Sequence, residues 1–302
     1  MIDSTFFFFI AAPAYFLSFL FYLFKIVFDP EATERSRESS PQALSITANR
    51  VRSAPLDWGH WALQMTRFSV VLATVGIILR TIQLGNASDW VISVFLPVTT
   101  TYGILTFFAW IIPLAYLIME RRYRFEGVGL WITGLSFVML AIAAIPEIAP
   151  RAVAPLVPAL QSYWLVIHVL FMLVGMAFFT VGFGASALLL WRRHRGVEPQ
   201  LLKKLEQLSY RANAIGFPFY GIGGIVFGGI WAKHAWGSYW QWDPKETAML
   251  IAWLAYAVYL HARVSWGWRD LKVAWLSAGA YGVVLYAWIG INYFVAGLHS
   301  FA

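Results

Sequence analysis

The segment from Trp231 to Glu246 reads W-A-K-H-A-W-G-S-Y-W-Q-W-D-P-K-E and lies between two long apolar segments. This Trp-rich segment holds four indoles, those of Trp231, Trp236, Trp240 and Trp242, in one short polar connection. An indole has a broad apolar face and one N–H donor, which suits stacking on a planar ligand or packing at a bilayer interface. Interfacial aromatic residues usually spread over loops on both faces, so a cluster in one connection favours a ligand site, with an aromatic belt as the alternative.

The last four residues of this segment, Asp243 to Glu246, predict the start of the next helix. Aspartate is a good N-cap and proline suits the first helical position. Glutamate at the third position can complete a capping box. The segment therefore ends where an apolar helix begins.

The composition of the chain indicates a membrane protein. Of its 302 residues, 60% are hydrophobic and 12% are charged, whereas a soluble domain is about one quarter charged. The chain has no cysteine, which excludes disulfides, thiolate metal sites and a cysteine nucleophile.

We expect an all-α, polytopic membrane protein with one membrane domain over residues 1–302. About eight apolar segments are long enough to span a bilayer, at residues 6–28, 68–84, 102–119, 127–145, 163–191, 211–230, 247–264 and 273–295. The sixth is rich in glycine, which permits close approach of helices. Arg80 lies inside the second, where we expect it to face the bundle or to snorkel.

The basic residues predict the orientation. With eight spans, residues 29–67 form a loop on the same side as most Lys and Arg residues, and that side is predicted to be cytoplasmic. Both termini and the Trp-rich segment then face outward. The residues on the basic side are Lys25, Arg35, Arg37, Arg50, Arg52, Arg67, Arg121, Arg122, Arg124, Arg192, Arg193, Arg195, Lys203, Lys204, Arg211, Arg263, Arg269 and Lys272; the other side has Arg151, Lys233 and Lys245.

Two histidines are predicted at the depth of the Trp-rich segment. His168 lies near the outer end of the fifth span and His299 just beyond the eighth. Two imidazoles beside a shelf of indoles could supply both axial nitrogens to a haem iron. The alternative is two interfacial histidines that form ordinary hydrogen bonds.

Two further histidines are candidate ligands. His234 lies within the Trp-rich segment and could assist or replace a ligand. His261 follows Pro244 by about 25 Å of helix, so it is predicted near the cytoplasmic end of the seventh span. On spacing alone, His261 snorkels beside Arg263.

The sequence W-G-S-Y-W-Q-W-D-P-K-E at residues 236–246 resembles the WWD motif of haem-handling membrane proteins that mature cytochromes c. The chain is most similar to the CcsA (ResC) family of System II cytochrome c synthases. Supporting matches are Y-L-H-A-R at residues 259–263, G-L-H-S at residues 297–300, and His168. The specific part of the resemblance covers residues 163–302, the haem-handling half, whereas the earlier half matches in span count and order.

The resemblance implies a subunit of a cytochrome c haem lyase. His168 and His299 match the external axial ligands of haem b, and the indoles with Asp243 match the motif that forms the haem shelf. His261 matches a transmembrane histidine that receives haem together with a histidine of the partner CcsB (ResB). The complex presents haem on the extracytoplasmic side of a bacterial plasma membrane or a thylakoid membrane, to an apocytochrome c with a CXXCH motif.

Two other functions stay open at this point. A haem transporter or chaperone similar to the CcmC branch would bind haem without synthase activity, although such chains are shorter. A b-type electron-transfer subunit would also bind haem, but its paired histidines commonly lie within the span interiors.

Overall fold

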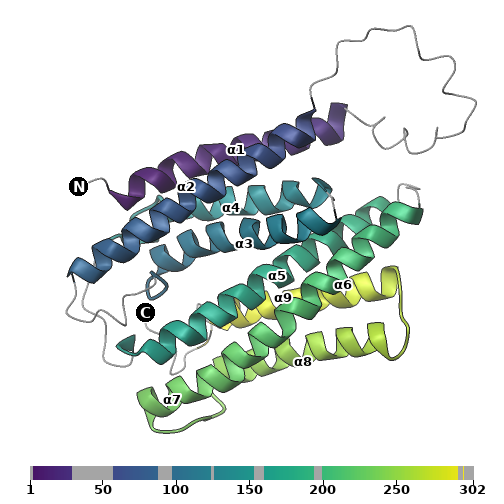
Figure 1. Cartoon of the computed structure of the whole chain (residues 1–302). Helices are drawn as coiled ribbons and strands as arrows, with labels where there is room; N and C mark the ends of the chain where they lie inside the picture. Colours follow the sequence, from purple (N-terminus) through teal and green to yellow (C-terminus); the bar gives the residue numbers. More distant parts are fainter. Residues whose placement is uncertain are drawn as a thin grey trace, which may run out of the picture.

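The computed structural model describes residues 3–28, 57–87, 97–123, 126–152, 160–193, 199–291 and 295. The described part is built from helices (Figure 1). They are α1 (Ser4–Phe28), α2 (Trp58–Ala87), α3 (Thr101–Tyr123), η3 (Glu126–Val128), α4 (Gly129–Ala143), α5 (Tyr163–Arg193), α6 (Pro199–Gly221), η5 (Ile222–Phe227), α7 (Gly228–Trp236), α8 (Pro244–Val264), α9 (Leu271–Leu285) and η6 (Tyr286–Gly290).

Seven of the described helical stretches are long and apolar enough to cross a membrane, and α4 is a shorter apolar helix. The expectation of an all-α, polytopic membrane protein is therefore confirmed, and the fourth of the eight predicted spans is this shorter helix. With 15 residues, α4 is about 22 Å long at 1.5 Å per residue. This length is less than the hydrocarbon thickness of about 30 Å.

The helices form two packed groups. In Figure 1, α1 to α4 lie on one side and α5 to α9 on the other, and α3 and α5 meet between them. Within the first group α1 packs along α2 and α4, and within the second α5 packs along α6 and α9. Successive helices run back and forth, so the head of α5, the end of α7 and the start of α8 lie together at the left of Figure 1.

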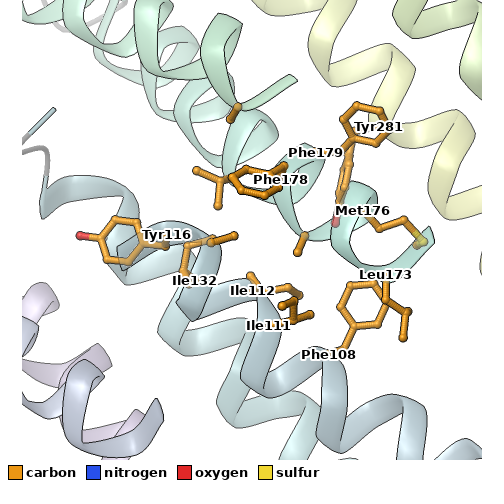
Figure 2. Packing of buried hydrophobic residues seen from close by; sticks show 14 of the residues in the cluster. Phe108, Ile111, Ile112, Tyr116, Ile132, Leu173, Met176, Phe178, Phe179 and Tyr281 are labelled. Atoms are coloured by element: carbon orange, nitrogen blue, oxygen red, sulfur yellow. The ribbon is translucent and has the colours of Figure 1, made fainter. Parts of the chain in front are cut away.

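Aromatic and aliphatic side chains fill the junction of the two groups. Phe108 and Ile112 of α3 face Leu173 and Met176 of α5 (Figure 2). Farther into the second group, the rings of Phe179 of α5 and Tyr256 of α8 stack with 3.5 Å between centroids.

Buried hydroxyl and amide groups join the helices of the second group. The Oγ atoms of Ser186 of α5 and Ser209 of α6 lie 2.7 Å apart and share a hydrogen bond. Asn213 Nδ2 of α6 donates to Ser277 Oγ of α9 at 3.0 Å. Thr180 of α5 and Tyr281 of α9 also share a hydrogen bond of 2.8 Å. Interhelical hydrogen bonds of this kind stabilise membrane bundles because lipid offers no competing partner.

Two helices begin earlier than predicted. The loop expected over residues 29–67 ends sooner because α2 begins at Trp58, where Asp57 Oδ1 accepts from the His60 amide at 3.0 Å. Residues 29–56 lie outside the described part. The helix expected from residue 211 begins at Pro199, because Leu202, Leu205 and Leu208 share a buried face and continue the helical pattern.

Arg80 faces the bundle, as expected for an arginine inside a span. Its side chain is buried, and its Nη2 donates to the carbonyl of Arg151 at 2.7 Å. The guanidinium also lies over the ring of Tyr102, 5.2 Å from the centroid. This cation is therefore held by a carbonyl and an aromatic face.

Candidate functional site

The Trp-rich segment divides into a helical part and an extended part. Trp231 and Trp236 belong to α7, which ends at Gly237 in the left-handed conformation with φ of 80°. The expectation that all four indoles lie in a loop is wrong for these two. Residues 231–236 contain no helix breaker, and Gly237 is the first residue that readily adopts positive φ.

The predicted capping box at the start of α8 is confirmed. Asp243 Oδ1 accepts from the Lys245 amide at 3.0 Å, and Glu246 Oε2 accepts from the amides of Gln241 and Asp243 at 2.9 and 3.3 Å. Both carboxylates are buried. The cap therefore fixes the extended part of the segment against the first turn of α8.

His168 of α5 lies against Trp231 of α7. The two rings are nearly parallel, with 11° between their planes and 5.9 Å between centroids. Nδ1 of His168 lies 2.8 Å from the carbonyl oxygen of Gly223. Trp231 is buried and His168 is half-buried. One imidazole that could bind a metal is therefore held against an indole of the Trp-rich segment.

The other indoles differ in exposure. The rings of Trp236 and Trp231 pack edge to face with 6.0 Å between centroids, and those of Trp240 and Trp242 pack in the same way with 5.7 Å between centroids. Trp240 packs against the core, whereas 69% of Trp242 is exposed. Trp242 also has φ of 56°, an uncommon conformation for a bulky residue, and among the four it presents the largest free aromatic surface.

Two basic side chains lie near the end of α7. Lys233 Nζ donates to the Gly237 carbonyl at 2.8 Å and lies 5.7 Å from the ring centroid of Tyr239. His234 Nδ1 lies 3.1 Å from the Ile230 carbonyl, within its own helix. His234 is exposed, so it stays an accessible extra imidazole within the Trp-rich segment.

The structure separates His261 from this site. His261 lies in the last turn of α8, at the end opposite the capping box. Its ring is exposed and packs edge to face on Trp266, with 5.1 Å between centroids. His299 lies outside the described residues, so its approach to His168 stays a prediction. Within the described residues, no group of three or more His, Cys, Asp or Glu side chains could hold a metal ion.

Two glycines of the sixth predicted span, Gly223 and Gly228, contact the site. A Cβ at Gly223 would lie 2.9 Å from the backbone nitrogen of Met172, and a Cβ at Gly228 would lie 3.0 Å from Nδ1 of His168. The glycine-rich pattern correctly predicted close helix approach. The pattern gave no signal that the approach occurs at His168.

The chain was compared with known proteins. Residues 98–299 match the model of the family described as cytochrome C assembly protein. Cytochrome c biogenesis protein CcsA of Chlamydomonas reinhardtii is 38% identical over 70% of this chain and 62% of its own length. The CcsA proteins of Trieres chinensis and of Synechococcus sp. (strain RCC307) are 31% and 35% identical, over 82% and 70% of this chain and 90% and 78% of their lengths.

The fold is also similar to that of a solved structure. The structure of cytochrome c heme lyase CcmF superposes with a TM-score of 0.64 and 16% identity, over 96% of this chain and 49% of that chain. This chain thus spans about half of that protein, and at this identity the likeness concerns the fold alone. The helices and the sequence relatives together make the chain an integral membrane protein, and it belongs to the cytochrome c assembly protein family.

Proposed function

We propose that the chain is the haem-binding membrane subunit of a cytochrome c synthase, with haem b as a substrate that it holds at the outer face of the membrane. The observation that carries the proposal is the stacking of His168 on Trp231. This contact joins a ligand-capable imidazole of α5 to the Trp-rich segment. Membership of the cytochrome c assembly protein family supports a role in cytochrome c maturation.

In this proposal the iron is held between two imidazoles. His168 supplies one axial nitrogen and His299 supplies the other, the latter on the strength of the resemblance at residues 297–300. Bis-histidine ligation leaves the haem edge accessible while the macrocycle rests on an aromatic surface. Trp242 offers that surface, since most of its indole is exposed.

The remaining residues of the motif position this surface. Trp231 orients His168, Trp236 supports Trp231, and Trp240 anchors the extended part to the core. Asp243 fixes the start of α8 and so the backbone that follows Trp242.

The proposed reaction needs no acid or base from the motif. Each thiol of the apocytochrome CXXCH adds across a haem vinyl group. The sulfur bonds to one vinyl carbon and the thiol hydrogen ends on the other, so no oxidant is consumed. The contribution of the protein is mainly to hold the reactants in position, and the histidine of CXXCH would displace one imidazole of the chain.

A second haem contact is proposed at His261. This residue is exposed near the opposite end of α8, where a second membrane protein can reach it. A histidine of CcsB (ResB) would complete this inner site, and haem would pass from there to the outer site on the extracytoplasmic side.

Purification of the chain with its partner tests the proposal. We expect haem absorbance in the wild type and a lower haem content in His168→Gly, which loses the outer site. His60→Gly should keep the wild-type haem content, because its histidine is exposed at the start of α2, away from both proposed sites. A wild type that purifies without haem, or equal haem in the two variants, contradicts the proposal. Coexpression with an apocytochrome bearing CXXCH separates the synthase from a transporter, because a synthase leaves covalent haem on the reporter.

A further inference from the structure

The helix that carries Trp231 changes its hydrogen-bond pattern beside His168. Between α6 and α7, the π-helical turn η5 has the Gly228 amide donating to the Gly223 carbonyl, five residues back. An α-helix would use the residue four back. Single π-helical turns are rare and occur frequently at functional sites.

The Gly223 carbonyl has a second partner in the same turn. Its oxygen has two lone pairs; one accepts from Gly228, and Nδ1 of His168 lies 2.8 Å from the oxygen. A carbonyl oxygen only accepts, so Nδ1 must carry the hydrogen. In the neutral imidazole the lone pair then resides on Nε2.

We propose that η5 is a positioning device that uses the Gly223 carbonyl to orient His168 and to select the tautomer whose Nε2 binds iron. Gly223 and Gly228 are then positioning residues for haem ligation. The inference rests on the proposed function, because it takes His168 as an axial ligand.

Steric contacts explain why glycine is needed at both positions. A Cβ at Gly228 would lie 3.0 Å from Nδ1 and 3.1 Å from Cε1 of His168. A Cβ at Gly223 would lie 2.9 Å from both the Met172 nitrogen and the Phe171 Cβ, which would push η5 away from α5. Either substitution lengthens the bond between His168 and Gly223.

The hydrogen bond also changes what the imidazole does for the iron. Donation of Nδ1–H to a carbonyl raises the basicity of the ligating nitrogen, as outer partners of metal-bound histidines do. A more basic ligand stabilises ferric over ferrous iron. Loss of the bond is therefore expected to raise the midpoint potential of the bound haem.

The first experiment measures that potential in the haem-loaded complex. We expect Gly228→Ala and Gly223→Ala to retain haem with a raised potential and shifted ferric EPR g-values. Gly279→Ala is the matched control, since nothing lies within 4 Å of its added Cβ, and it should match the wild type. Unchanged potentials and g-values in both variants overturn the inference.

The second experiment avoids folding defects by restoring the ligand from solution. In His168→Gly, 4-methylimidazole keeps a donating N–H, whereas its isomer 1-methylimidazole has a methyl group at the equivalent nitrogen. The ratio of the affinities of the two compounds for haem in detergent alone is the baseline. We expect the variant to favour 4-methylimidazole over 1-methylimidazole by a ratio about fivefold above this baseline, the value of one net hydrogen bond. Equal preference overturns the inference but leaves haem binding by the chain intact, whereas a wild type without haem overturns the proposed function itself.

Discussion

The half-buried Arg263 of α8 and the buried Glu206 of α6 form an ion pair, with 2.8 Å between Nη2 and Oε1. Their side chains are 13% and 7% exposed. Glu206 Oε2 also accepts from the Asp270 amide at 3.1 Å, and Arg269 Nε lies 3.8 Å from Oε1. One carboxylate therefore connects α6, α8 and the turn into α9, at the end of the bundle opposite the Trp-rich segment.

Glu206→Gln is expected to destabilise the chain by about 3 kcal/mol, because removal of one partner leaves a half-buried cation unpaired. Thermal unfolding in detergent measures this change. Glu147→Gln is the control, since Glu147 is exposed and its replacement should leave Tm unchanged. Equal Tm values for the two variants would show that the ion pair contributes nothing to the stability of the fold.

Asp270→Gly is expected to stabilise the chain. Asp270 has φ of 56° and ψ of −128°, and its side chain makes no capping hydrogen bond. A non-glycine residue in such a sparsely populated region costs on the order of 1 kcal/mol, and glycine removes that cost. Tm should rise in Asp270→Gly and should not rise in Asp270→Ala; a higher Tm for the alanine variant would refute the assignment of strain.

Trp242→Ala is expected to weaken haem retention on the order of tenfold, which corresponds to about 1.4 kcal/mol. It should leave Tm nearly unchanged, because most of this indole packs on nothing within the chain. Trp275→Ala is the matched control, since that indole is 64% exposed on α9 and Trp242 is 69% exposed. Haem titration of both variants checks the prediction, which fails if they lose haem equally.

Asp243→Ala is expected to cost about 1 kcal/mol, the usual value of a lost N-cap. Glu246→Gln should cost less, because glutamine keeps an acceptor for the Gln241 and Asp243 amides. Hydrogen exchange of the first turn of α8 locates the effect. Faster exchange in Asp243→Ala that is absent from Glu246→Gln is the expected result, and the reverse order would contradict the capping role.

The predictions from sequence that held rest on local chemistry. The capping box at Asp243 and Glu246 needs four adjacent residues and a following apolar run, so the sequence contains all of its determinants. The burial of Arg80 follows similarly, since a charge inside an apolar span has few favourable positions.

The predictions that failed depended on where a helix begins or ends. The polar and aromatic residues 231–236 predict a loop, but hydropathy does not terminate a helix and only Gly237 supplies the left-handed conformation. The start of α2 carried a usable signal, since Asp57 is an N-cap before Trp58. The contact of His168 with Gly223 could not be predicted, because it requires the register between two helices and a π-helical turn.

The continuous helix from Pro199 to Trp236 has 38 residues, so at 1.5 Å per residue it is about 57 Å long. A bilayer with its headgroups is about 40–45 Å thick, so this helix is longer than the bilayer and must either tilt strongly or extend beyond the headgroups. Glu206 lies near one end and Trp231 near the other. A rigid tilt of this helix about its middle would displace Glu206 and Trp231 in opposite directions, because they lie on either side of its centre.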